Sequence, residues 1–130
     1  MVWNIQSRSA VGPLAIGMTV IEFRQILGRE DKTFKRLPDA EDIIYVYNLE
    51  SLHLTCNNGG MVKIISVFRP KVVCYSGISL LGREIDEVVA ELVSKGITVE
   101  KEDAGYWVAA AGVLLVDVDG ITDGLELYPD

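Results

Sequence analysis

The sequence predicts an α+β fold: an internal duplication of a β-α-β-β-β unit that builds an antiparallel sheet or sheets, with one helix per repeat packed on a face. Two observations predict it. Residues 17–28 and 82–93 are similar helical segments that stand 65 positions apart. Each is followed by short runs rich in β-branched and aromatic residues, with turn signals in the same order. We therefore expect residues 1–130 to form a single domain made of two repeats, 1–69 and 70–130.

The first helix is predicted from GMTVIEFRQILG, residues 17–28, which carries its own start and stop signals. Thr19 followed by Glu22 fits a capping box, in which the hydroxyl accepts from a first-turn amide and the glutamate reaches back. Apolar residues then recur on the face of Phe23, and Gly28 supplies the left-handed residue that ends the helix.

The second helix is predicted from GREIDEVVAELV, residues 82–93. Ile85, Val88 and Leu92 follow the spacing of one helix face, and acidic residues crowd the first turn, where the helix dipole favours them. Because each helix has a single apolar stripe, each is expected to cover a sheet.

Three strands are predicted after each helix from their β-branched and aromatic residues and from the turn signals between them. They are residues 43–48, 51–56 and 61–68 in the first repeat, and residues 105–110, 112–118 and 121–128 in the second.

The boundary between the repeats is expected at Pro70. Residues 29–36, REDKTFKR, are expected to be a solvated loop. DVDGITDG, residues 117–124, is expected to be a hairpin turn, because its glycine and glutamate do not fit a calcium loop.

Composition points to a folded protein of the cytoplasm. Hydrophobic residues make up 49% of the chain, yet no apolar run approaches the roughly 18 to 20 residues of a membrane helix. The N-terminus lacks a charged start followed by an unbroken apolar stretch, so no signal peptide is expected. Cys56 and Cys74 are not spaced as a metal pair and do not make a disulfide scaffold, so we expect free thiols in a reducing cytosol.

Charge is divided unequally between the repeats. Twelve basic and 19 acidic residues give a net charge of −7. Split at Pro70, the first half holds eight basic and seven acidic residues, which gives +1, and the second holds four and twelve, which gives −8. An anionic half favours a protein partner with a basic surface and repels phosphate, so neither nucleic acid nor a membrane is expected as partner. The other interpretation, that the acidic residues only keep the chain soluble, stays open.

The candidate partner-binding residues combine the densest carboxylates of the second half with two adjacent aromatic residues, a mixture common at binding surfaces. They are Glu84, Glu87, Glu91, Glu100, Glu102, Asp103, Tyr106 and Trp107. Aromatic residues in strands are also often core residues, and this alternative stays open for both of them.

No catalytic, cofactor-binding or metal-binding site is predicted. His53 is the only histidine and lies between Leu52 and Leu54, so it should point to the polar side of its strand. The glycine-rich motifs of dinucleotide-binding and phosphate-binding loops do not occur. We therefore expect a protein that is not an enzyme and needs no cofactor. A carboxylate pair of Asp117 with Asp123 remains as an unspecific alternative.

The segment GPLAIGMTVIEFRQILGRE, residues 12–30, resembles a recurring bacterial pattern with a GMT or GMS helix start and an LG end. The pattern is that of small proteins similar to the β-lactamase-inhibitor protein and to small outer-membrane assembly lipoproteins. The first resemblance implies tandem helices on an antiparallel sheet. The chain lacks an N-terminal lipidation cysteine, so an outer-membrane role is not expected. Its W-x-I opening also looks like small bacterial immunity partners of secreted toxins, and this likeness implies action by binding.

Two hypotheses of function follow. The first is a non-catalytic, immunity-type inhibitor whose acidic half occupies a basic cleft on a toxin enzyme. The alternative is a small-molecule-binding or enzymatic domain with a pocket between the two repeats. It predicts a buried polar cluster at their junction, such as His53 with carboxylates. A homodimer with no other ligand is a third possibility, which the sequence does not separate from these two.

Overall fold

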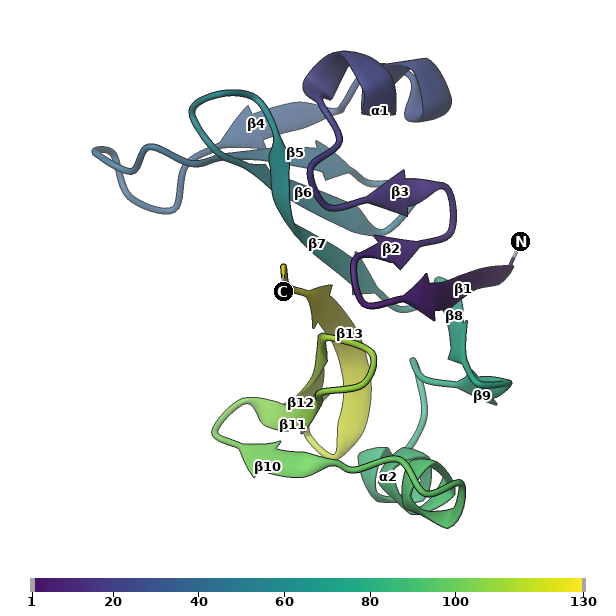
Figure 1. The fold of residues 1–130 in the computed structure, drawn as a ribbon. Helices are drawn as coiled ribbons and strands as arrows, with labels where there is room; N and C mark the ends of the chain where they lie inside the picture. Colours follow the sequence, from purple (N-terminus) through teal and green to yellow (C-terminus); the bar gives the residue numbers. More distant parts are fainter. Residues whose placement is uncertain (1, 130) are drawn as a thin grey trace.

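Two β-sheets and two short helices make up the computed structural model, which describes residues 2–129 (Figure 1). The larger sheet is antiparallel throughout, with the spatial order β10 (Glu100–Glu102), β11 (Gly105–Val108), β12 (Val113–Val118), β13 (Ile121–Leu127), β7 (Val62–Phe68), β6 (Leu52–Cys56), β5 (Ile43–Tyr47) and β4 (Lys32–Phe34). The smaller sheet has the order β3 (Leu14–Ala15), β2 (Ala10–Val11), β1 (Val2–Ser7), β8 (Val72–Tyr75) and β9 (Ile78–Ser79). The helices are α1 (Val20–Leu27) and α2 (Ile85–Ser94).

The predicted α+β class is wrong, because the chain is mostly β. Strands make up 46% of it and helices only 14%, and the strands form two large sheets. The prediction missed short strands that have no apolar alternation of their own. The segment 29–36, expected as a loop, contains β4, and a hairpin stands before each helix instead of a single strand. These strands are stabilised by their neighbours in the sheet rather than by local sequence preference.

The middle of the larger sheet is the antiparallel pair β7 and β13, which joins the two halves of the chain. Leu125 lies opposite Val67 and Leu127 opposite Ile65, and all four side chains are fully buried. On each side of this pair, the strands follow in the reverse of their order along the chain: β6, β5 and β4 on one side, and β12, β11 and β10 on the other. The origin of this arrangement by duplication remains a prediction.

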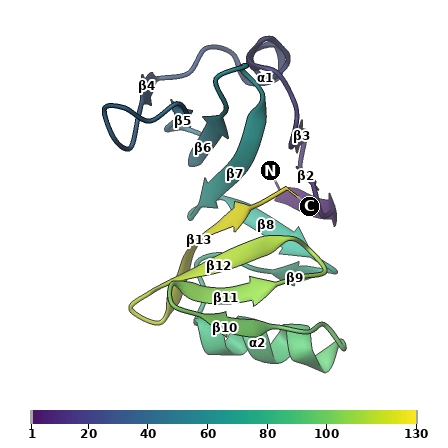
Figure 2. The same ribbon diagram turned by 60° about the vertical axis from the view of Figure 1, so that its left-hand side comes forward.

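The core lies between the two sheets, because the smaller sheet and both helices are on one side of the larger sheet (Figure 2). Trp3 and Ile5 of β1 enter it from the smaller sheet, Phe23 from α1 and Leu92 from α2. Burying such side chains is the main source of stability in a domain of this size. The strand β1 also links the halves, because it pairs with β2 on one side and, in parallel, with β8 on the other.

The capping box predicted for the first helix is confirmed. Thr19 Oγ1 accepts from the amide of Glu22 at 3.2 Å, and the amide of Thr19 donates to Glu22 Oε1 at 3.0 Å. Phe23 is fully buried and meets the rings of Tyr45 and Tyr47 edge-on, with centroids 5.3 and 6.1 Å away. The start of α1 and its contact with β5 are therefore both fixed by side chains.

Both cysteines are free thiols, as expected. Cys56 is buried in β6, and burial raises the pKa of its thiol to about 12. None of the helices in the described part of the chain combines the length and apolar character needed to cross a membrane.

Candidate functional site

The outer face, defined here as the face of the larger sheet turned away from the smaller sheet and the helices, carries one row of side chains across all eight strands. The register sets the row as Glu100, Trp107, Leu114, Glu126, Ser66, His53, Val46 and Lys32. Because facing residues of paired strands point to the same side, the row runs from a carboxylate at β10 to an ammonium at β4.

At the acidic end of this row, Glu100, Glu102 and Asp103 are all exposed. Among residues 2–129, β10 pairs with β11 alone, so it is an edge strand whose other side offers backbone groups without a strand partner there. Lys101 between the two glutamates points to the opposite face, where its ammonium lies 4.9 Å from the ring centroid of Tyr106. The edge therefore presents carboxylates on the outer face and turns its one cation away from them.

The helical carboxylates differ in their partners. Arg83 makes an ion pair with Glu91 and lies 3.7 Å from a carboxylate oxygen of Glu87. The hydrogen bond from the guanidinium holds the pKa of Glu91 below its ordinary value. Glu84 stands immediately before α2, exposed, and its side chain makes no capping bond. Arg83 thus offsets part of the charge of α2, whereas Glu84 takes part in none of the ion pairs between described residues.

Tyr106 and Trp107, predicted together as anchors, point to opposite faces of β11, as neighbouring residues of a strand must. Tyr106 packs against the hydrophobic core. Trp107 lies on the outer face, opposite Glu100, and its ring centroid is 6.2 Å from that of Tyr128. Only Trp107 is placed beside the acidic edge on a surface that a partner can reach.

Tyr128 extends this aromatic group. Its hydroxyl donates to Glu126 Oε1 at 2.7 Å, and burial together with this carboxylate raises the pKa of the phenol to about 12. The phenol therefore stays neutral at physiological pH and keeps Glu126 in place as an acceptor.

A second aromatic group on the outer face was not predicted. His53 lies between Phe34 and Phe68, with ring centroids 5.9 and 5.0 Å away. Burial, then the positive charges of Arg36 and Lys32, lower the pKa of His53, so the imidazole is neutral near pH 7. The alternation of 61–68 could have placed Phe68 here. Phe34 could not be found, because its segment was expected to be a loop.

The predicted hairpin turn at DVDGITDG is confirmed between β12 and β13. Asp119 and Gly120 have φ values of 53° and 83°, and Asp117 Oδ1 accepts from the amide of Gly120 at 2.8 Å. Asp123, its suggested carboxylate partner, instead accepts from Arg69 at 2.9 Å. Within residues 2–129 no group of three or more His, Cys, Asp and Glu side chains is arranged to hold a metal ion.

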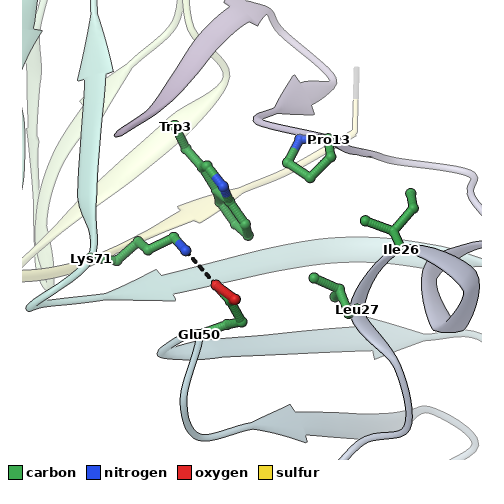
Figure 3. A pocket seen from close by; sticks show the side chains of 6 residues that line it. All are labelled: Trp3, Pro13, Ile26, Leu27, Glu50 and Lys71. Atoms are coloured by element: carbon green, nitrogen blue, oxygen red, sulfur yellow. Dashed lines mark hydrogen bonds and ion pairs between the residues drawn. The ribbon is translucent and has the colours of Figure 1, made fainter. Parts of the chain in front are cut away.

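A pocket of about 310 Å³ opens beside the end of α1 (Figure 3). Its lining residues are Trp3, Pro13, Ile26, Leu27, Glu50 and Lys71. The ammonium of Lys71 makes an ion pair with Glu50 and lies 3.9 Å from the ring centroid of Trp3. The side chain of Lys71 is only 12% exposed, whereas that of Glu50 is 39% exposed. One side of the pocket is thus charged and the other apolar.

The junction of the halves does not match the alternative hypothesis in its predicted form. The core side of the β7–β13 pair is filled by apolar side chains, and His53 packs against phenylalanine rings rather than carboxylates. The pocket beside α1 draws five of its six lining residues from the first half, and only Lys71 from the second.

A scan against protein-family models, a search of curated proteins and a search of solved structures find no match to this chain. The resemblance to proteins similar to the β-lactamase-inhibitor protein therefore stays a prediction from a short segment.

Proposed function

We propose that this chain is a non-catalytic protein-binding module and that its partner presents a basic surface. The contact is made by the acidic surface, defined as Glu100, Glu102 and Asp103 at the edge strand β10 with Trp107 as the aromatic anchor beside them. Glu84, Glu87 and Glu91 lie at α2, on the helix side of the sheet, and add to the negative field that draws the partner in. Tyr106 is left out, because its ring packs against the core.

The observation that carries the proposal is a set of exposed carboxylates without cations of their own. Among the ion pairs between described residues, none involves Glu84, Glu100, Glu102 or Asp103. These groups therefore add no ion pair to the stability of the fold. Unpaired like charges instead repel one another, and a basic partner relieves this repulsion and is drawn in from a distance.

The neighbouring edge supports the same contact. β10 leaves backbone donors and acceptors unpaired, and Trp107 stands opposite Glu100 on the outer face. Tryptophan is enriched among residues that dominate binding energy, and carboxylates around it select a basic partner and speed its arrival. The resemblance of the W-x-I opening suggests the concrete form, an immunity-type inhibitor acting in the cytoplasm on a toxin enzyme with a basic cleft.

Affinity capture from a lysate of the source cells, followed by measured binding of the captured protein, tests the proposal. The decisive variant is Glu100→Lys with Glu102→Lys. The matched control is Asp39→Lys with Glu41→Lys, which changes the net charge equally in the loop before β5. We expect the first variant to weaken binding at least about tenfold, and the control to change it by less than about twofold.

Two further measurements complete the test. Rising salt should slow the association of the unaltered chain, because it screens the attraction between the surfaces. Trp107→Ala should speed dissociation, because it removes the buried anchor. Capture of no partner, capture of one with an acidic binding surface, or equal binding by both charge variants would each contradict the proposal.

A further inference from the structure

The pocket beside α1 has a polar end of unusual composition. Lys71 supplies an ammonium group on a side chain that is only 12% exposed, and Glu50 supplies a carboxylate on a side chain that is 39% exposed. The ammonium has three donors: Glu50 accepts one, and the face of Trp3 attracts the cation. The bond uses one oxygen of the carboxylate, and the other oxygen is able to accept. The polar end therefore presents a donor and an acceptor side by side, with opposite charges that cancel.

The remaining walls are apolar. Pro13 comes from the turn between β2 and β3, and Ile26 and Leu27 come from the last turn of α1 (Figure 3). Ile26 is 47% exposed although it lies on a helix with a buried stripe, so it contributes to the wall rather than to the core. A volume of about 310 Å³ is at the lower end of the range for pockets that hold small molecules, about 300 to 1,000 Å³.

We propose that this pocket binds a small uncharged amide with a branched apolar body. The amide carbonyl accepts from the ammonium of Lys71, and the amide N–H donates to the free oxygen of Glu50. The branched body lies against Pro13, Ile26 and Leu27.

The charge pair explains why the ligand is uncharged. A carboxylate on the ligand would meet Lys71 favourably and Glu50 unfavourably, and an ammonium group would meet them in the reverse way. Only a group with an acceptor and a donor close together satisfies both residues without breaking their ion pair. An amide does this with separate atoms, a carbonyl that accepts from Lys71 and an N–H that donates to Glu50.

The test compares three ligands that share one carbon skeleton: 3-methylbutanamide, 3-methylbutanoate and 3-methylbutylammonium. Binding is read from the fluorescence and the indole N–H resonance of Trp3 in a Trp107→Phe background, which leaves Trp3 as the sole tryptophan. We expect the amide to bind at least about tenfold more tightly than either charged analogue. N-acetyl-leucinamide, added as a fourth ligand, shows whether a peptide segment can supply the same amide.

Three variants show whether the charge pair sets the preference. Glu50→Gln leaves Lys71 as an unbalanced cation, so the preferred ligand should become 3-methylbutanoate. Lys71→Met leaves the carboxylate of Glu50 as an unbalanced anion, so the preferred ligand should become 3-methylbutylammonium. Ile26→Ser, a control at the exposed wall, should weaken all three ligands by a similar factor, since it removes apolar contact alone. Glu50 lies in the turn between β5 and β6. Far-UV circular dichroism of each variant checks that it is folded.

The outcomes separate cleanly. The proposal is supported if the unaltered chain prefers the amide, Glu50→Gln prefers the carboxylate and Lys71→Met prefers the ammonium ligand. No response of Trp3 to any ligand, equal binding of the three ligands, or an unchanged preference in Glu50→Gln would overturn it. These results do not depend on the acidic surface, which lies on the other half of the chain.

Discussion

Gly12→Ala is predicted to lower the free energy of unfolding by about 2–5 kcal/mol, and contact with Trp3 is the main cause. Gly12 has φ of +56°, where an alanine costs about 1–2 kcal/mol. An added Cβ would lie 2.6 Å from both Cγ and Cδ2 of Trp3. These atoms are at the base of the indole, so the whole ring must move within a packed core, and such overpacking costs about 1–3 kcal/mol.

Gly17→Ala separates the two contributions. Gly17 has φ of +91°, and an added Cβ would meet nothing within 4 Å. Alanine at this position therefore suffers backbone strain without a clash. A double-mutant cycle isolates the contact itself: in a Trp3→Leu background, the cost of Gly12→Ala should fall towards the cost of backbone strain alone.

Urea unfolding measures the effect. With a slope of about 2 kcal/mol per molar urea, the contact should separate the midpoints of Gly12→Ala and Gly17→Ala by about 0.5–1.5 M. Because Trp3 is held against Lys71, the near-UV circular dichroism of folded Gly12→Ala should also change, and that of Gly17→Ala should not. Equal midpoints, or an unchanged cost of Gly12→Ala in the Trp3→Leu background, would refute this account.

Two other predictions concern the helix start and the outer face. Thr19→Ala should lower stability by about 1 kcal/mol through loss of the capping box, whereas Ile21→Ala, at a side chain 71% exposed, should change it by less than about 0.5 kcal/mol in the same thermal melts. Tyr128 should ionise near pH 12 in an absorbance titration. Because the folded chain then holds this proton longer than the unfolded chain, stability should fall as pH rises from about 10 to 12, and Tyr128→Phe should make this fall shallower.

Local signals in the sequence were sufficient to predict both helices and the long strands. The capping pair Thr19 and Glu22 fixes the start of α1, and regular apolar spacing predicts α2. The long strands β7 and β13 were predicted from their β-branched and aliphatic residues and from the turn signals beside them. The fold class was predicted wrongly because some strands give no such local signal. β4 and β10 are three-residue edge strands with every side chain exposed, so neither has a buried face to produce a pattern.

The candidate site was predicted only in part, for a similar reason. The carboxylates were found because they are dense in the sequence, but their pairing with Arg83 depends on the turn before α2. Adjacent aromatic residues cannot both face a partner from one strand, and sequence alone does not say which of Tyr106 and Trp107 points outward. The pocket was not predicted at all, because Trp3, Glu50 and Lys71 are brought together from distant segments.

The placement of the helices explains how one fold can support two unrelated surfaces. The residue before each helix makes an isolated antiparallel bridge to a residue at or just before the start of the last strand in the same half of the chain. Thr19 pairs with Met61, and Glu84 pairs with Ile121. Packing on the sheet constrains only the inward stripe of each helix, so the outward residues are free to differ. α1 accordingly presents Ile26 to a pocket, whereas α2 begins at the exposed carboxylate of Glu84. Substitutions on either outward side should therefore alter one surface and leave both the core and the other surface unchanged.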